Sequence, residues 1–172
     1  MYKYLLYFLI FSFLGWCAEV IYCAVKSGTL VNRGLARGPI CPIYGVGMCM
    51  SVLLLGSVKS FILLALLSMA VATLVELTIG YVSHRILGHR LWDYTDERGN
   101  IHGYVCPRFS LIWGVISASV IKLLPLAEPL IDRLSGPIFY AISFVLLIVT
   151  VVDIKTSIRR NQSKGIVFNT DK

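Results

Sequence analysis

Two acidic residues stand alone inside long apolar stretches of the sequence. Glu19 is the only charged residue in the stretch 4–25, and Glu76 is the only one in the stretch 60–82. An ionisable side chain is costly inside a membrane, so such residues commonly mark sites for protons, ions or substrates. The alternative is that each carboxyl group is protonated or paired with an arginine and only locks the packing.

The two acids are predicted to lie at a similar depth. With a rise of about 1.5 Å per residue, Glu19 lies roughly 9 Å from the end of its helix, and Glu76 lies about as deep in a helix that runs the other way. Small or polar residues share a helix face with each acid, and a third such face occurs in the later run 108–124. Faces of this kind let membrane helices approach closely. These faces are Ser12, Gly15, Glu19 and Cys23; Ser68, Ala72, Glu76 and Gly80; and Ser110, Gly114 and Ser117. We expect the three faces to meet and both carboxylates to point into the bundle.

The segment 31–47 is rich in glycine and proline. Its four glycines and two prolines argue against a continuous helix, and its apolar residues allow it to dip into the membrane. Irregular backbone persists there only if it is buried in protein or lines a wet cavity. Arg33 and Arg37 could grip a phosphate or carboxylate, or pair with the two acids, and Tyr44 is a further candidate contact. A plain connecting turn with two topology-setting arginines is the alternative.

The segment 91–108 concentrates hydrogen-bonding side chains. Trp92 and Tyr94 are typical of interface anchors, whereas Asp93 or His102 could serve as a general base. A lone loop histidine is, alternatively, simply solvated. The candidate substrate-binding residues are therefore Glu19, Arg33, Arg37, Tyr44, Glu76, Trp92, Asp93, Tyr94, Asn100 and Arg108.

Five apolar runs must position these residues. The chain is 57% hydrophobic and 15% charged, against roughly 45–50% apolar residues in a soluble domain. Each run approaches the roughly 17–25 residues that cross hydrocarbon as a helix, and none alternates as a barrel strand would. We predict an all-α, polytopic membrane helical bundle of about five transmembrane helices, forming one domain over residues 1–153, with a basic cytoplasmic tail over residues 155–172. The expected helices span about 4–25, 42–58, 60–84, 108–124 and 134–154.

Basic residues predict the orientation. With a cytoplasmic C-terminus, the inside segments hold twelve of the sixteen Lys and Arg residues, as the positive-inside rule requires. We therefore expect the N-terminus outside, the C-terminus inside, and both polar segments on the cytoplasmic side. Because the net charge of +7 is explained by topology, we expect no nucleic-acid partner.

A series of short motifs is more specific than any one of them. The series is Gly15-Trp16 with Glu19; Asn32-Arg33-Gly34 ahead of Gly38-Pro39-Ile40-Cys41-Pro42-Ile43-Tyr44-Gly45; Glu76; Trp92-Asp93-Tyr94; Asn100, Gly103 and Cys106; and Ser110 with Trp113. In this series, over about two thirds of the chain, the sequence resembles the bacterial family labelled Putative ABC-transporter type IV, or CmpB-like permease. Arg37, His84 and His102 depart from the family pattern.

The resemblance implies transport in a bacterial cytoplasmic (inner) membrane, and three functions stay open. The first is a permease-like subunit, expected to be a homo-oligomer because five short helices enclose little space, with a cytoplasmic-side pocket formed by the buried acids and arginine. The second is an intramembrane enzyme that acts on a lipid or amphipathic substrate at the inner leaflet, with Asp93 or His102 as the base. The third is a membrane assembly or regulatory protein.

Several catalytic motifs are missing from the sequence. It has no Gly-x-x-x-x-Gly-Lys-Ser/Thr loop, so an ATP-driven cycle would need a separate ATPase or other transporter subunit. It has no Gly-x-Ser-x-Gly elbow and no His-Glu-x-x-His pair. Its cysteines and histidines lack close ligand spacing, so we expect no metal site and no cofactor. Membrane lipid is the remaining expected partner.

Overall fold

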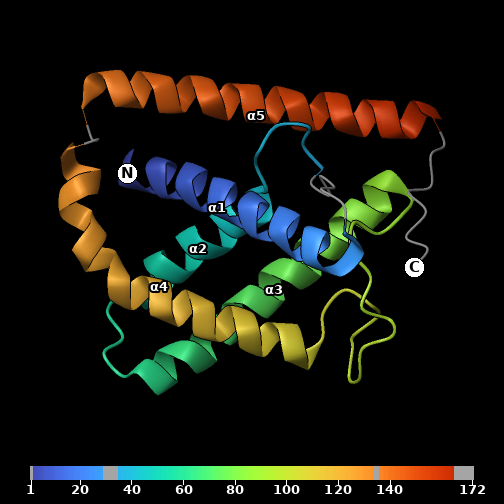
Figure 1. Ribbon diagram of the computed structural model, residues 1–172, viewed down its shortest axis with the longest axis horizontal. Coiled ribbons are helices and arrows are strands. Elements are labelled where there is room, and N and C mark those ends of the chain that lie inside the picture. The colour runs from blue at the N-terminus through green and yellow to red at the C-terminus, as the bar shows by residue number, and fades with distance from the viewer. Residues whose placement is uncertain (1, 29–34, 134–135, 165–172) are drawn as a thin grey trace.

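The computed structural model describes residues 2–28, 35–133 and 136–164, and within them the protein is built from helices (Figure 1). The helices are α1 (Tyr2–Ser27), α2 (Pro42–Leu55), α3 (Phe61–Leu87), α4 (Pro107–Arg133) and α5 (Pro137–Lys164). Four of them, α1, α3, α4 and α5, are long and apolar enough to cross a membrane. The predicted all-α membrane bundle is confirmed.

α2 begins at residue 42, where the sequence predicts a helix over 42–58, but it ends earlier, at Leu55. α2 has 14 residues, a length of about 21 Å, which falls short of the roughly 30 Å hydrocarbon core. It begins partway along α1, where the Cys41 N–H donates to the Ser12 carbonyl at 2.9 Å. It then runs back toward the start of α1, where Cys49 Sγ lies 3.3 Å from the Tyr4 carbonyl oxygen. The irregular segment Leu35–Cys41 thus leads into α2 beside α1, and α2 is not among the helices long enough to cross a membrane.

Proline, serine and glycine set the helix ends. Pro42, Pro107 and Pro137 open α2, α4 and α5, where the missing N–H of proline costs no hydrogen bond. The Ser60 hydroxyl accepts from the Leu63 N–H at the start of α3, which ends at Gly88 in a left-handed conformation.

Two helices run further than the sequence pattern indicates. α4 continues to Arg133 through Pro125 and Pro129, and it curves along its length in Figure 1, as interior prolines dictate. α5 continues to Lys164, so residues 155–164 of the predicted tail are helical.

The two ends of the bundle are distinct. α1, α3 and α5 end where α4 begins, beside the loop 88–106 (Figure 1), and we call this end the loop side. At the opposite end, Lys3 Nζ lies 2.7 Å from Asp132 Oδ1, and Lys122 Nζ donates to the Val58 and Lys59 carbonyls at 3.1 and 2.6 Å. These contacts join the start of α1 to the end of α4, and α4 to the turn before α3.

The interior is tight and partly polar, because small residues bring the helices together. α3 packs most closely with α4, and α1 with α2, whereas α5 makes sparse contacts and lies apart from the others in Figure 1. A Cβ at Gly114 would lie 2.7 Å from Met69 Cβ. The buried polar side chains of α1 to α4 are Ser12, Ser51, Ser68, Glu76, Ser83, Ser110 and Ser117. The predicted small-residue faces are therefore largely the buried faces.

Candidate functional site

Glu19 is held by an aromatic residue from the short helix α2. The Tyr44 hydroxyl donates to Glu19 Oε1 at 2.5 Å. Tyr44 lies in the first turn of α2 and its ring packs directly on Gly15, where any Cβ would overlap the ring carbons. Because Gly15 and Glu19 are one helical turn apart, the glycine makes room for the ring whose hydroxyl then reaches the carboxylate.

Glu76 is the more buried of the two acids, with 8% of its surface exposed. Its Oε1 accepts from the indole N–H of Trp113 at 3.1 Å and from the Tyr94 hydroxyl at 3.5 Å. Trp113 comes from α4 and Tyr94 from the loop 88–106. Three segments of the chain therefore meet at this carboxyl group.

The two acids belong to one cluster. The rings of Tyr44 and Trp113 meet edge to face, with centroids 5.2 Å apart and planes at 76°. A chain of contacts thus runs from Glu19 through these two rings to the second acid, and we call Glu19, Tyr44, Glu76, Tyr94 and Trp113 the acid–aromatic cluster. It lies in the loop-side half of the bundle.

Tyr94 closes the cluster on the loop side. Its ring stacks on Phe109, with centroids 4.8 Å apart and planes at 16°. Burial, together with the nearby Glu76 carboxylate, raises the pKa of the Tyr94 phenol far above its ordinary value. The phenol therefore stays protonated and acts as a hydrogen-bond donor at physiological pH.

One oxygen of the cluster has no partner. Glu76 Oε2 is fully buried and has no hydrogen-bond partner within the described residues. A buried carboxylate oxygen without a partner is costly as an anion. The oxygen is therefore a place where a proton, a cation or a donor group from a substrate would be stabilised.

Two candidates of the loop 88–106, Asp93 and Asn100, form hydrogen bonds within the loop. Asp93 accepts from Arg90 Nη1 with both oxygens at 2.9 Å, and from the Thr95 N–H at 2.9 Å. Asn100 donates to the Thr95 and Glu97 carbonyls and accepts from the Gly103 N–H. These bonds keep the loop in a fixed shape.

Three other candidates lie on the rim of the loop or inside its fold. The Trp92 indole N–H donates to the Tyr104 carbonyl at 2.8 Å. Arg108 is exposed and lies 3.4 Å from Glu97. His102 is exposed, with a φ of 52°. The structure thus brings Glu19, Tyr44, Glu76 and Tyr94 together, and it leaves these three candidates outside that cluster.

Of the two arginine candidates in the segment 31–47, the structure describes one. Arg33 lies outside the described residues. Arg37 is exposed, and its backbone N–H donates to Asp153 Oδ2 at 2.7 Å, as does the Gly38 N–H at 3.0 Å. Asp153 on α5 therefore fastens the irregular segment that leads into α2.

Sequence reasoning missed two residues of this arrangement. Trp113 belongs to the motif series but was not among the candidate site residues; it is the donor to Glu76, and its position beside Gly114, on a helix with a small-residue face, was a further signal. Asp153 is the only acidic residue of α5, at the end of its apolar stretch. No group of three or more metal-ligating side chains occurs in the described part of the chain.

The fold and the cluster define a class: a polytopic α-helical membrane protein in which a half-buried and a buried acid lie near the short helix α2. A family model described as Putative ABC-transporter type IV matches residues 6–158, so the chain belongs to that family. The match runs from α1 into α5 and confirms the resemblance seen in the motifs. Searches of the curated proteins and of the solved structures returned no match.

Proposed function

We propose that the protein is a permease-like transport subunit in which Glu19 and Glu76 form a polar site for a proton, ion or substrate. The family places the chain among membrane proteins of the ABC-transporter type. The proposal adds the site and its chemistry. One observation carries it. Hydrogen bonds to Oε1 hold the Glu76 side chain in place, yet its other carboxyl oxygen, Oε2, is buried and has no partner among the described residues.

The break before α2 supports this proposal. Helix N-termini carry a partial positive charge from their unpaired N–H groups. α2 begins inside the bundle, and Tyr44 of its first turn contacts Glu19. Transporters of several folds place substrate or ion sites at such discontinuous helices near the membrane midplane.

The partners and location follow from the same proposal. A subunit without a phosphate-binding loop would work with a separate ATPase or another transporter subunit. The small interior of five helices favours a homo-oligomer. We further propose that the protein resides in the bacterial inner membrane, with the loop side cytoplasmic, the N-terminus outside and the C-terminus inside, since that orientation satisfies the positive-inside rule. Green fluorescent protein fused after Lys172 would then fluoresce, and alkaline phosphatase at the same place would be inactive.

Proton flux tests the site directly. The purified protein is placed in liposomes that enclose the pH-sensitive dye pyranine, and a pH gradient is imposed. The wild-type protein should collapse the gradient faster than protein-free vesicles, because the unpartnered carboxyl oxygen can take up and release a proton. Glu76→Gln should return the rate to that of protein-free vesicles.

Asp132→Asn is the matched control, since Asp132 is an acid paired with Lys3 at the opposite end of the bundle. It should leave the rate unchanged. Equal rates in the wild type and in Glu76→Gln would contradict a proton site at Glu76. If Glu76→Gln changed only the unfolding temperature, the assembly or regulatory function would be favoured instead.

An enzyme acting on lipid at the inner leaflet is less well supported. That function needs Asp93 or His102 as a base. Asp93 already accepts hydrogen bonds from Arg90 and Thr95, and these bonds stabilise the carboxylate and weaken it as a base.

A further inference from the structure

α5 stands away from α3, and the space between them is apolar. One hollow, of about 280 Å³, is bordered by α3 residues that include Ile79, Val82 and Ile86, by Leu35, and by Ile158 of α5. A second hollow, of about 430 Å³, follows α5 and shares Ile158 with the first. The smaller hollow lies between α3 and α5, and the larger one runs along α5 from the shared Ile158. We call the two together the groove.

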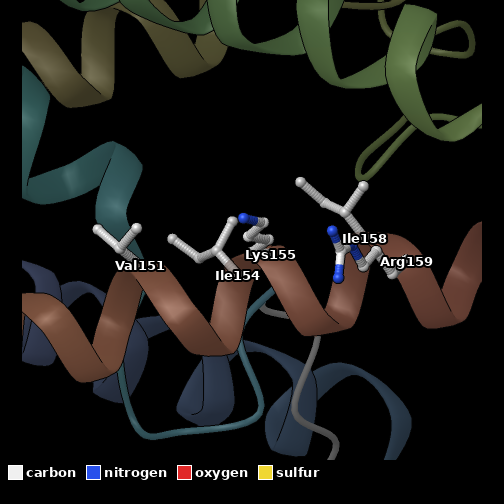
Figure 2. Close-up of a pocket in the computed structure, with 5 residues that line it drawn as sticks. All are labelled: Val151, Ile154, Lys155, Ile158 and Arg159. Atoms are coloured by element: carbon white, nitrogen blue, oxygen red, sulfur yellow. The ribbon is translucent and has the colours of Figure 1, made fainter.

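Two basic side chains border the groove. Lys155 and Arg159 line the larger hollow together with Val151, Ile154 and Ile158. Figure 2 shows their nitrogen atoms on the same side of α5 as these apolar side chains. Within the described residues, no acidic side chain borders either hollow, so the two positive charges are not neutralised there.

The nearest acid on α5 is already engaged. Asp153 accepts from the backbone N–H groups of Arg37 and Gly38. It is two residues from Lys155, which places it on a different face of the helix. The groove therefore combines apolar walls with a positive edge.

The depth of the basic pair matches that of lipid headgroups. Lys155 follows the start of α5, at Pro137, by about 27 Å of helix, and the hydrocarbon core is roughly 30 Å thick. Lysine and arginine at that level contact phosphate groups, and arginine can donate two parallel hydrogen bonds to one phosphate. The apolar walls below would contact an acyl chain.

We propose that this groove is a binding site for an anionic phospholipid, with its phosphate between Lys155 and Arg159 and one acyl chain along Ile79, Val82 and Ile158. The site lies outside the acid–aromatic cluster and does not depend on the proposed transport function. A free phosphate ion is disfavoured as the occupant, because it would have to leave water for an apolar groove.

Lipid-dependent stability tests the site. The purified full-length protein in an uncharged detergent is titrated with phosphatidylglycerol or with phosphatidylcholine of the same acyl chains, and thermal unfolding is recorded. Phosphatidylglycerol should raise the unfolding temperature by several degrees near saturation, and phosphatidylcholine should raise it much less. Native mass spectrometry should show the anionic lipid retained on the protein.

Two variants and a control make the result specific. The double variant Lys155→Gln with Arg159→Gln should lose the preference for phosphatidylglycerol. Ile158→Trp, which places a bulkier side chain where the two hollows meet, should weaken the binding of either lipid. The control Lys59→Gln with Arg133→Gln removes the same charge elsewhere and should keep the preference.

Three results would overturn the proposal. One is an equal phosphatidylglycerol preference in the Lys155 and Arg159 variant. Another is an equal loss of that preference in the control variant, which would mean that the lipid responds to the overall positive charge of the protein and not to this groove. The third is a full shift produced by inorganic phosphate alone, which would mean an ion site without an acyl chain.

Discussion

The Tyr44 hydroxyl donates a 2.5 Å hydrogen bond to Glu19 Oε1, although the two residues are 25 positions apart in the chain. The bond joins α1 to the first turn of a helix that starts inside the bundle. It fixes the ring of Tyr44 against Trp113, and Trp113 in turn donates to Glu76. The break before α2 and the two acids therefore form one connected structure.

Tyr44→Phe tests this connection. The change keeps the ring on Gly15 and Trp113 but removes the donor to a half-buried carboxyl group. We expect a loss of about 1–3 kcal/mol in the free energy of unfolding, measured by thermal or denaturant unfolding in detergent. The control is Tyr81→Phe, since Tyr81 is 51% exposed and should tolerate the change. Equal effects at the two positions would mean that the hydrogen bond to Glu19 contributes nothing.

A double-mutant cycle tests the contact between Trp113 and Glu76. Trp113→Phe removes the indole N–H that lies 3.1 Å from Glu76 Oε1, and Glu76→Leu removes the oxygen that accepts from it. Contacting residues usually couple by about 0.5–3 kcal/mol. We expect the double variant to unfold with a free energy that differs from the sum of the single effects by an amount in that range. Strict additivity would contradict the contact.

The sequence predicts part of this site because helical periodicity shows which residues lie on the same face of a helix. The spacing of Gly15 and Glu19 places them on one side of α1, and the spacing of Ser68, Glu76 and Gly80 does the same on α3, where all three are buried. Apolar run lengths likewise predict the four long membrane helices.

The partners of the acids could not be predicted in the same way. The sequence predicts the start of α2 at residue 42, but Tyr44 reaches Glu19 only because the first turn of α2 packs against the middle of α1, and no local pattern in 42–58 indicates that pairing. Trp113 reaches Glu76 from a helix 37 positions away in the sequence. Contacts of this kind depend on how helices pair, which a local pattern does not encode.

Asp153→Ala should release the irregular segment from α5. The Asp153 carboxylate accepts from two backbone N–H groups, those of Arg37 and Gly38, and the alanine variant removes both bonds. Because each net bond to a charged group contributes about 1.5–3 kcal/mol, hydrogen exchange at these amides should accelerate at least about tenfold. Thr156→Ala is the control, since the Thr156 hydroxyl donates only to the Asp153 carbonyl. Unchanged exchange in Asp153→Ala would show that the segment is held by other contacts.

Gly103→Ala and Gly88→Ala form a matched pair. Both glycines have a left-handed φ, of +72° and +75°, so alanine pays a similar conformational cost at each. A Cβ at Gly103 would lie 2.7 Å from Asp93 Oδ1 and 2.8 Å from Arg90 Nη1, whereas nothing lies within 4 Å at Gly88. We expect Gly103→Ala to be more destabilising by about 1–3 kcal/mol, measured by thermal unfolding. Similar losses would mean that the loop relaxes around the added methyl group.

The Asp93 carboxyl group gives the loop a pH dependence of predictable sign. Burial raises the pKa of Asp93, but hydrogen bonds from the Thr95 backbone and from Arg90 outweigh it, so the pKa lies below its ordinary value. An acid whose pKa is lower in the folded state stabilises that state above its unfolded pKa of about 3.9, and it loses this contribution as the pH falls through the folded pKa. The wild type should therefore unfold at a higher temperature than Asp93→Asn at pH 5–7, and the difference should shrink below about pH 4. Asp96→Asn removes an exposed acid from the same loop and should show a smaller difference at neutral pH. A difference between wild type and Asp93→Asn that grew on acidification would have the opposite sign, and it would mean that the protonated form of Asp93 is the one the loop prefers.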